Sequence, residues 1–462
     1  LFGPAAVYAE PGDVRNRIED FYTTPALYRE QGERAGEIVE QRFSHQTHRA
    51  RIEALIGRPA GSTVPISNRW QARPGISTGK KAARGRRRVL FMSSNGVGMG
   101  HLTRLLAIAK RLPPTIDPIF LTMSQAAACV QDFGYPVEYL PYHGYLGCDI
   151  RLWNHHLRRD LTERFAFYRP DAVIFDGNVP YDGLINAASS IPTCPLVWSR
   201  RAMWTEGAGR DHVWRERYFD VVIEPGEVAG DLDQGLTAEY RGKTRGVNPI
   251  LLLDREDLLD RQQARVELGL AADRPACLIQ LGAGNNFDSS TIRALILEAL
   301  LQHPDLQIAW LDWAIAENEA VLPPSIKRIK TYPLARYLNA FDCAVSAAGY
   351  NAYHEMLSHG LPTLFVPNEH PMMDDQLARA FHADLRGLGL ILRRRDHYRV
   401  QDVVARLLDP AEQAGMSRRC AELAIDNGAV EAARILDELV YTCRADLDPG
   451  QDIVPALRRF GG

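Results

Sequence analysis

Residues 343–376 combine small and polar side chains at a spacing that suits a phosphorylated ligand. An apolar run ends at a Ser-Ala-Ala-Gly turn (346–349), a short helical pattern carries Glu355, and a second apolar run follows at 362–366. This order predicts a strand, a tight turn, a helix and a second strand. Small turn residues let a diphosphate approach the backbone. The N-terminus of the helix offers it unpaired N–H groups and the positive end of a dipole.

Glu355 places a carboxylate about a turn and a half inside the predicted helix, roughly 9 Å beyond the turn at 1.5 Å per residue. A ribose attached to a diphosphate at the turn would present its hydroxyls at about this distance. The segment therefore predicts a site for a nucleotide diphosphate with a further group attached. The alternative is an ordinary βαβ crossover without a ligand, because small turns and helical glutamates are common.

A second glycine-rich stretch lies earlier in the chain. The sequence Gly-Val-Gly-Met-Gly-His, residues 96–101, follows the apolar run 89–92 and opens an amphipathic helical pattern that stops at Pro113. Its glycines do not have the GxGxxG spacing, and no acidic residue ends the next apolar run at 118–122. A nicotinamide dinucleotide site is therefore not favoured.

The stretch 345–376 resembles the donor-binding segment of nucleotide-sugar glycosyltransferases of the GT-B fold. It is most similar to the bacterial N-acetylglucosaminyltransferases that complete the lipid-linked peptidoglycan precursor, and to macrolide and plant relatives. The resemblance implies that the turn holds the diphosphate, that Glu355 binds the ribose hydroxyls, and that an acidic–Gln pair binds the sugar hydroxyls. The implied residues at the turn and in the pair are Ser346, Gly349, Tyr350, Asn351, Asp375 and Gln376.

The phrase Gly-Met-Gly-His-Leu-Thr-Arg, which starts at Gly98, resembles the first loop of the acceptor half of these enzymes, and Gly98 and Gly100 are expected among the donor-binding residues. The resemblance implies that His101 is the general base, a role that suits an imidazole with a pKa near neutrality. Asp176 ends the apolar run 172–175, and ligands in doubly wound sheets lie beyond such strand ends. Its carboxylate could fix the tautomer of His101 and stabilise the imidazolium. Capping roles are the alternative for both residues.

A third turn, after the apolar run 276–281, contains Gly282, Gly284 and Asn285. The resemblance implies contact with the diphosphate, and a plain tight turn is the alternative. In this fold the backbone N–H groups can stabilise the leaving diphosphate, so we expect neither a cofactor nor a metal. The Asp-X-Asp letters at 231–233 and 446–448 lie in polar segments rather than at a strand end.

Apolar runs alternate with helical patterns twice along the chain, which predicts an α/β protein with two Rossmann-like, doubly wound domains facing across a cleft. Residues 1–57 resemble the tail of a second, retaining type of GT-B transferase, which implies a remnant of an upstream domain. A plain helical extension is the alternative. The predicted parts are a helical extension (1–57), a basic linker (58–88), an acceptor-side domain (89–245), an interdomain linker (246–268) with a charged helix at 254–268, a donor-side domain (269–445) and a tail (446–462).

Composition narrows the class of protein. The 462 residues are 46% hydrophobic, enough for two cores, and a net charge of −3 argues against a nucleic-acid partner. Seven cysteines without a CxxC pair fit a reducing, cytoplasmic setting. No apolar stretch approaches the ~20 residues of a membrane span. Residues 80–88 carry six cations, which suit either a solvated linker or peripheral contact with an anionic membrane.

These features together predict a glycosyltransferase of the hexosyltransferase type. It would move a sugar from a nucleotide diphosphate such as UDP to a hydroxyl of a small-molecule, glycan or lipid-linked acceptor, with inversion. Loops 142–153 and 200–214 would recognise the acceptor. Two alternatives remain. One is a same-fold hydrolase or 2-epimerase using His354, His359 or His370, and the other is a non-catalytic module that binds nucleotide sugars.

Overall fold

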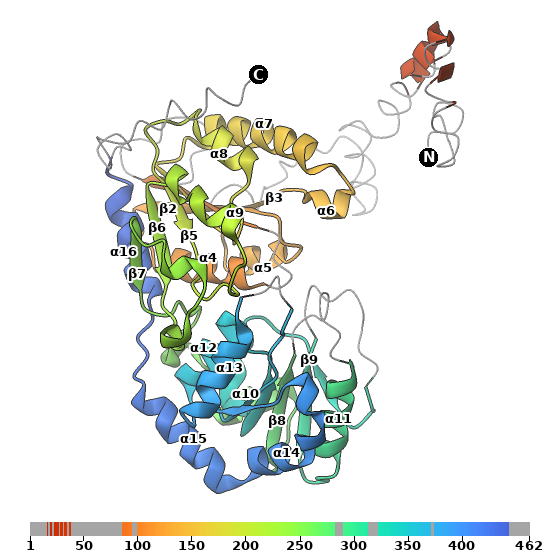
Figure 1. The fold of residues 1–462 in the computed structure, drawn as a ribbon, viewed down its shortest axis with the longest axis vertical. Coiled ribbons are helices and arrows are strands. Elements are labelled where there is room, and N and C mark those ends of the chain that lie inside the picture. Colours follow the sequence, from red (N-terminus) through yellow and green to blue (C-terminus); the bar gives the residue numbers. More distant parts are fainter. Residues whose placement is uncertain are drawn as a thin grey trace, which may run out of the picture. The chain divides into compact units, whose positions relative to one another are not determined.

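The computed structural model describes residues 86–94, 99–281, 290–312, 322–370 and 374–442, and scattered positions between residues 16 and 37. The chain divides into two compact units, Leu1–Gln71 and Ala72–Gly462. In the first unit the described positions are helical except Thr24. The second unit contains two parallel sheets, each with helices on both faces (Figure 1).

The first sheet has seven parallel strands in the order β3-β2-β1-β4-β5-β6-β7. Six of them lie where apolar runs predicted strands. The seventh, β7, was missed because Arg245 and Gly246 are exposed and only Val247 is buried. The strands are β1 (Arg87–Ser93), β2 (Ile116–Thr122), β3 (Val137–Tyr139), β4 (Ala172–Asp176), β5 (Leu196–Ser199), β6 (Val221–Pro225) and β7 (Thr244–Val247).

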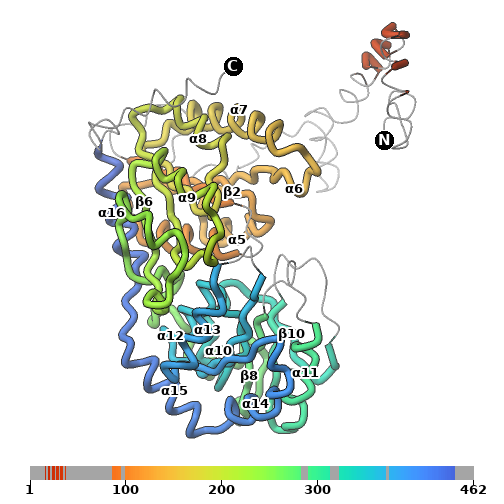
Figure 2. Tube along the Cα trace, in the orientation of Figure 1, coloured from red at the N-terminus to blue at the C-terminus, as the bar shows by residue number. Residues whose placement is uncertain are grey.

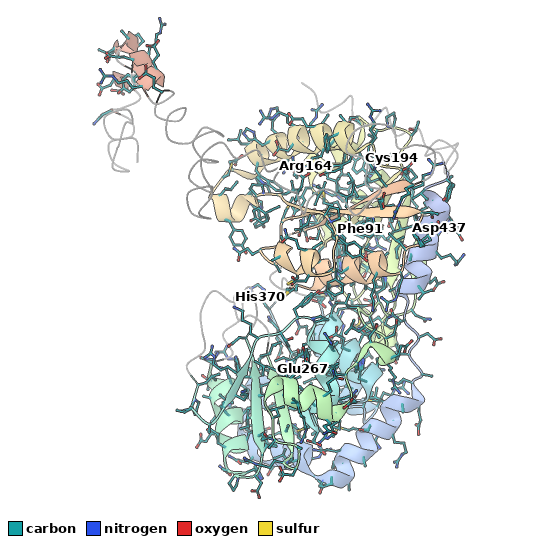
Figure 3. All side chains as sticks on the ribbon, turned by 180° about the vertical axis from the view of Figure 1, so that it is seen from behind. Phe91, Arg164, Cys194, Glu267, His370 and Asp437 are labelled. Atoms are coloured by element: carbon teal, nitrogen blue, oxygen red, sulfur yellow. The ribbon has the colours of Figure 1, made fainter. Side chains whose placement is uncertain are left out.

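Helices cover both faces of this sheet. On one face α4 (Gly100–Lys110) and α5 (Ala127–Asp132) pack against alternate strand residues, including Phe91, whose ring stacks on Phe120 at 5.2 Å (Figure 3). On the other face lie α7 (Ile150–Tyr168) and α8 (Asp182–Ala188). Short helices α6 (His143–Leu146) and α9 (Arg210–Val213) complete this half.

The second sheet has six parallel strands in the order β10-β9-β8-β11-β12-β13, which repeats the order of the first six positions of the first sheet. This confirms two doubly wound sheets. The strands are β8 (Ala276–Gln280), β9 (Gln307–Leu311), β10 (Lys327–Ile329), β11 (Cys343–Ser346), β12 (Thr363–Phe365) and β13 (Leu390–Ile391). The helices are α10 (Arg261–Leu268), α11 (Ser290–Leu301), α12 (Tyr350–His359), α13 (Gln376–Leu385), α14 (Val400–Leu408) and α15 (Pro410–Glu422).

One hydrophobic cluster spans the two halves, and a helix that follows the second half in sequence packs against the first half. Helices α10 and α12 face the same core cluster as α4. The last described helix, α16 (Ala429–Leu439), returns to the first half and packs against α4 and β7, although the predicted donor-side domain extended to residue 445 (Figure 2). The helix expected at 254–268 is two pieces, a 3-10 turn (Arg255–Asp257) and α10, because Asp254 and Asp260 each cap a new N-terminus.

The basic run partly belongs to the fold. Strand β1 begins at Arg87, inside the predicted linker. Arg86 pairs with Asp117 at 2.8 Å, Arg87 pairs with Asp171 at 2.8 Å, and buried Arg88 donates to a backbone carbonyl. The run's other three cations lie outside the described residues, so fewer than six cations are available for a membrane contact. Within the described part of the chain, no helix has the length and apolarity needed to cross a membrane.

Candidate active site

His101 lies in the first turn of α4, directly after the glycine loop that follows β1. Of that loop, Gly98 lies outside the described residues, and Gly100 is the first residue of the helix. β1 and β4 are neighbours with Ser93 opposite Asp176, and the Ser94 amide donates to the Asp176 carbonyl at 3.0 Å. The sheet register therefore brings the start of α4 and the end of β4 to the same edge.

Asp176 is fully buried, and its Oδ1 lies 2.7 Å from His101 Nδ1. The structure thus brings together the two residues that the sequence predicted as a pair. When Nδ1 carries the proton and donates a hydrogen bond to Asp176, the free lone pair of the imidazole lies on Nε2. The His101 side chain is 13% exposed, so the ring is largely enclosed but not fully buried.

Arg104 is a site residue that the sequence reasoning missed. Its Nε and Nη2 donate to Asp176 at 3.0 and 2.5 Å, and Ser199 Oγ donates to the same carboxylate at 2.7 Å. The signal was present in the sequence, because Arg104 is three residues after His101 and such residues share a helix face. An arginine in an amphipathic helix is usually taken for a surface residue, whereas this one is 1% exposed.

The surroundings lower the pKa of both members of the pair, which favours a charged Asp176 and a neutral His101. Burial alone would disfavour the carboxylate, but Arg104 and His101 hold the pKa of Asp176 down at about 2. Burial lowers the pKa of the His101 imidazole, and the cations Arg104 and Arg201 add to this against the attraction of Asp176. His101 is therefore neutral at neutral pH, as a proton acceptor must be.

On the opposite half, the Ser-Ala-Ala-Gly turn leads from β11 into α12. Ser346 is buried at the strand end, and Gly349 is the N-cap of α12 with an extended backbone and no side-chain cap. The first N–H groups of α12 therefore donate to no capping side chain. A Cβ on Gly349 would lie 3.8 Å from Gln376 Nε2, so the turn and the predicted acidic–Gln pair are adjacent.

The next two predicted donor-binding residues contact the first half. Asn351 accepts from Arg104 Nη1 at 3.3 Å and donates to the Gly100 carbonyl at 3.4 Å. The Tyr350 hydroxyl donates to the Gly226 carbonyl at 2.9 Å, and its ring is 2% exposed. These side chains join the first turn of α12 to the first half.

Glu355 lies in the middle of α12 and is partly exposed. Burial raises the pKa of Glu355 to about 7. Among the described residues, its carboxylate has no hydrogen-bond partner. A carboxylate that is partly desolvated and lacks a protein donor is suited to accept hydrogen bonds from a ligand.

The acidic–Gln pair and the residue before it have separate roles in the structure. Asp375 caps α13 by accepting from the Ala378 amide at 2.8 Å. Gln376 is 5% exposed and accepts from the Asn368 amide at 3.1 Å. Asp374 is buried and pairs with Arg201 of the first half at 2.9 Å.

Asp374 belongs to a buried ionic network between the halves. Arg379 of α13 pairs with Asp374 and, at 2.8 Å, with Glu227, which follows β6 in the first half. His354 lies 3.1 Å from the same glutamate. Although burial opposes ionisation, Arg379 and His354 hold the pKa of Glu227 at about 2, and Arg201 and Arg379 hold the pKa of Asp374 below its usual range.

Acid is expected to destabilise the first half around Asp176 and the contact between the halves around Glu227 and Asp374. The pKa values of Asp176, Glu227 and Asp374 lie below those of the unfolded chain, so their stabilisation is complete above about pH 5 and is lost as pH falls toward 2. Each is worth on the order of 2 kcal/mol. Thermal unfolding between pH 6 and 2.5 measures this, with exposed Asp384→Asn as a control that should follow the wild type. A melting temperature that stays level down to pH 3 would contradict the assignment.

The predicted third turn cannot be placed, because Gly282, Gly284 and Asn285 lie outside the described residues. Among the described residues, no cluster of three or more His, Cys, Asp or Glu side chains could hold a metal ion. Asp231, from one of the two Asp-X-Asp sequences, pairs with Arg386 on an exposed surface, and the second such sequence is not described.

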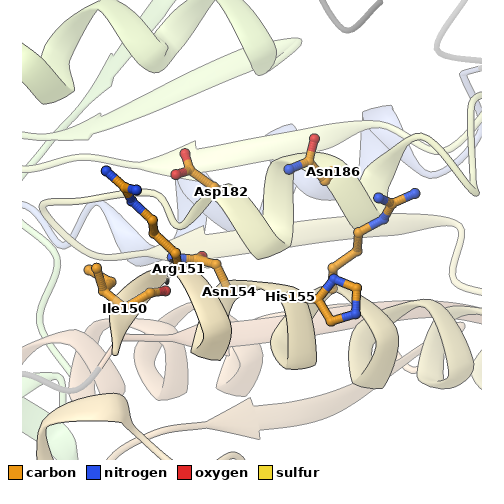
Figure 4. A pocket seen from close by; sticks show the side chains of 7 residues that line it. Ile150, Arg151, Asn154, His155, Asp182 and Asn186 are labelled. Atoms are coloured by element: carbon orange, nitrogen blue, oxygen red, sulfur yellow. Dashed lines mark hydrogen bonds between the residues drawn. The ribbon is translucent and has the colours of Figure 1, made fainter. Parts of the chain in front are cut away.

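A separate groove of about 320 Å³ lies between the first turns of α7 and α8 on the outer face of the first half (Figure 4). It contains none of the predicted catalytic or donor-binding residues, but it overlaps the predicted acceptor loop 142–153. Polar residue types line it apart from Ile150: Arg151, Asn154, His155, Arg158, Asp182 and Asn186.

Comparisons with known proteins agree with the donor-side geometry. Residues 327–433, which contain α12 and α13, match the model of the glycosyltransferase family 28 C-terminal domain. Over 139 residues the chain is 28% identical to the aclacinomycin-T 2-deoxy-L-fucose transferase of Streptomyces galilaeus, covering 30% of this chain and 27% of that protein.

A second relative is the UDP-N-acetylglucosamine–N-acetylmuramyl-(pentapeptide) pyrophosphoryl-undecaprenol N-acetylglucosamine transferase of Clavibacter sepedonicus. The identity is 26% over 206 residues, covering 41% of this chain and 52% of that protein. The chain therefore spans about a quarter to a half of these relatives. The resemblance of the donor segment to such transferases is confirmed, while that of residues 1–57 to a second transferase stays a prediction.

Solved structures share the fold. The spinosyn forosaminyltransferase SpnP has a TM-score of 0.55 at 15% identity, covering 77% of this chain and 99% of its own. The MurG structure from Acinetobacter baumannii has a TM-score of 0.52 at 17% identity, covering 76% and 99%. At these identities the likeness concerns the fold alone, and it confirms the predicted GT-B architecture.

Proposed function

We propose that the protein is a glycosyltransferase that moves a sugar from a nucleotide diphosphate, UDP in the first instance, to an acceptor hydroxyl. The reaction would invert the anomeric carbon and need no metal ion. The observation that carries the proposal is the His101–Asp176 contact of 2.7 Å, which is linked through Arg104 to the uncapped N-terminus of α12. A base and an anion-binding helix end are the two parts that such a transfer requires.

In the proposed donor complex, the diphosphate oxygens accept hydrogen bonds from the first N–H groups of α12, and the ribose hydroxyls donate to Glu355. The sugar lies toward Gln376, which adjoins the Gly349 turn, and toward Asp375, the residue before it. Asp374 takes no part in sugar binding, because Arg201 and Arg379 occupy its carboxylate.

In the proposed reaction, Nε2 of His101 accepts the proton of the acceptor hydroxyl as its oxygen attacks the anomeric carbon. The bond between that carbon and the diphosphate oxygen breaks, and the leaving electron pair stays on the diphosphate. Asp176 keeps the proton on Nδ1 and offsets part of the charge of the imidazolium. The N–H groups and dipole of α12 stabilise the departing diphosphate.

The contacts of the histidines favour this reaction over epimerisation. His354 is fully buried, and its Nδ1 donates to the Tyr350 carbonyl at 2.7 Å. His359 Nδ1 likewise donates to the Glu355 carbonyl at 2.7 Å. His354 Nε2 also accepts from the Val228 amide at 3.2 Å, so both ring nitrogens of His354 are engaged, whereas His359 Nε2 has no hydrogen-bond partner among the described residues.

The acceptor is proposed to approach from the first half, over loops 142–153 and 200–214. The second loop already touches the donor half, since the Asp375 amide donates to the Met203 carbonyl at 2.8 Å. A small molecule, a glycan or a lipid-linked sugar would each meet arginine and aromatic side chains along these loops.

Replacing Glu355 by alanine is expected to weaken donor binding by about 1.5–3 kcal/mol, the value of hydrogen bonds to a charged group. This corresponds to roughly a 10- to 150-fold rise in the Kd of UDP in calorimetry. The matched control is Glu298→Ala, an exposed glutamate on α11, which should bind as the wild type does. An unchanged Kd in Glu355→Ala would remove Glu355 from the site.

The pH dependence of binding gives a second readout of the same residue. Because the pKa of Glu355 is raised to about 7, its carboxylate becomes a full acceptor only as pH rises from 6 to 8. UDP affinity should rise more steeply over this range in the wild type than in Glu355→Gln. The terminal phosphate also titrates near pH 6, but it does so with both proteins. Parallel slopes would contradict the role.

A panel of nucleotide sugars, incubated with and without acceptors, tests the function. Mass spectrometry should detect a glycosylated acceptor in at least one combination, and only slow release of free sugar without an acceptor. Rapid hydrolysis or epimer formation without an acceptor would favour the epimerase or hydrolase. Binding without any turnover would leave a non-catalytic module.

A further inference from the structure

We propose that Arg104 is a positioning residue that aligns the His101–Asp176 pair with helix α12, so that the base is correctly oriented only while the two halves are in contact. Its catalytic consequence rests on the proposed function. The alignment itself rests on the hydrogen bonds of three guanidinium nitrogens.

The guanidinium of Arg104 binds to both halves. Nε and Nη2 of Arg104 hold the two oxygens of Asp176 at 3.0 and 2.5 Å. Nη1 points the other way and donates to Asn351 on α12 at 3.3 Å. The guanidinium also lies over the Tyr350 ring, 5.3 Å from its centre. A planar fork can make these contacts together, whereas the single ammonium of lysine cannot.

The contact with α12 is closed by a second bond that returns to the start of α4. Asn351 donates to the Gly100 carbonyl at 3.4 Å, one residue before His101. Separating the halves would break this bond and the Arg104–Asn351 bond together. Arg104 would then keep only its contacts within the first half, where it lies 2.9 Å from His101 Nδ1.

The distance between Arg104 and His101 matters because Nδ1 can hydrogen-bond to only one of its two neighbours at a time: it donates to Asp176 or accepts from Arg104. If Nδ1 carries the proton, it donates to Asp176, and Nε2 is free to accept a proton. If Arg104 donates to Nδ1, the proton lies on Nε2, and the ring cannot act as a base there. Asn351 holds Nη1 and thereby fixes the plane of the guanidinium, whose Nη2 lies 2.5 Å from Asp176 Oδ1 and 2.9 Å from His101 Nδ1. The shorter contact with Asp176 leaves Nδ1 its own proton, which is the tautomer that catalysis needs.

Arg104 also balances charge. It neutralises Asp176, so a proton added to His101 creates a net positive charge in a buried site, and Arg201 on the neighbouring loop opposes it further. The charged groups that face His101 are Asp176 from β4, Arg104 from α4 and Arg201 after β5. Removing the charge of Arg104 should therefore make His101 easier to protonate.

Two substitutions separate geometry from charge. Arg104→Gln loses both, so kcat should fall about 10- to 100-fold, the scale of a misplaced catalytic group, and the acidic limb of the kcat profile should move to higher pH. Arg104→Lys keeps the charge, so kcat should fall similarly while the limb stays in place. The control, Arg111→Gln at the other end of α4, should change neither. Wild-type kcat and an unmoved limb in Arg104→Gln would overturn the proposal.

Asn351→Ala tests the link between the halves without leaving a buried charge unpaired, so it remains informative if the Arg104 variants fold poorly. It should lower kcat about 3- to 10-fold without moving the acidic limb. An unchanged kcat would overturn the coupling to α12.

Nitrogen-15 NMR of the histidine side chains tests the proposal without any turnover. The His101 signal, identified by its loss in His101→Asn, should report a proton on Nδ1 in the wild type and titrate at higher pH in Arg104→Gln. An identical titration in the two proteins would overturn the proposal even if the enzyme is active. Conversely, the expected shift in a protein that turns over no nucleotide sugar would uphold the alignment while the proposed function fails.

Discussion

Alanine in place of His101 should lower kcat about 10²–10⁴-fold while the Kd of the nucleotide changes by less than about twofold, as expected for the loss of a general base. The reason is geometric. His101 is the imidazole at the start of α4 that Asp176 orients at 2.7 Å, whereas the nucleotide is proposed to bind on α12. Initial-rate kinetics with the active donor–acceptor pair, together with UDP calorimetry, measure the two quantities separately.

The matched control is His156→Ala, an exposed histidine on α7 of the same half, which should keep wild-type kcat. Near-normal turnover in His101→Ala would leave His101 with only a structural role at the helix start. A large rise in Kd without loss of kcat would instead make it a ligand of the diphosphate.

Asp176→Ala should cost about 3–5 kcal/mol of folding stability, because it leaves the buried guanidinium of Arg104 without its anion. Both side chains are at most 1% exposed, so water cannot replace the lost partner. Denaturant unfolding at pH 7 measures the loss. Asp176→Asn keeps the shape of the side chain, and should lower kcat to an extent comparable with His101→Ala if the pair acts as a unit.

Asp182→Ala is the control for the stability measurement. Asp182 also pairs with an arginine, Arg215 at 2.6 Å, but its side chain is 59% exposed. Such a pair is worth no more than about 1 kcal/mol. If the two alanine variants lost equal stability, the buried pair would not have the energetic role assigned to it.

The strands were predictable because buried parallel strands are continuous apolar runs. The apolar runs 307–311 and 343–346 predicted strands at the residues where β9 and β11 lie, and the predicted ends of most other strands differ by one to three residues. β7 was missed because it lies at the edge of its sheet with two exposed residues. The break at 258–260 was missed as well, although Asp254 and Asp260 are both acceptable N-cap residues.

The His101–Asp176 contact was predictable for a topological reason. Asp176 ends β4, and His101 lies in the first turn of the helix that follows the neighbouring strand β1. A doubly wound sheet gathers its strand ends and the helix starts that follow them at one edge. What the sequence could not reveal is which helix residues cross between the halves. Arg104, Tyr350 and Asn351 meet over separations of more than 200 residues, and no local periodicity encodes that contact.

On the donor side, too, the sequence predicted where residues lie but not the contacts and burial that the fold gives them. Asp375 stands directly before a helix, so its capping role was readable from the residue type alone. The pairing of the neighbouring Asp374 with Arg201 from the first half was not readable in this way. Glu355 could be placed on its helix from the sequence, whereas its raised pKa depends on burial by the surrounding fold.

A crystal structure of the protein soaked with UDP tests the central claim most directly. We expect the diphosphate within hydrogen-bonding distance of the N–H groups at the start of α12, the ribose hydroxyls on the Glu355 carboxylate, and His101 Nε2 facing the space beside the diphosphate. UDP bound elsewhere on the chain, or an α12 N-terminus left empty at saturating UDP, would contradict it.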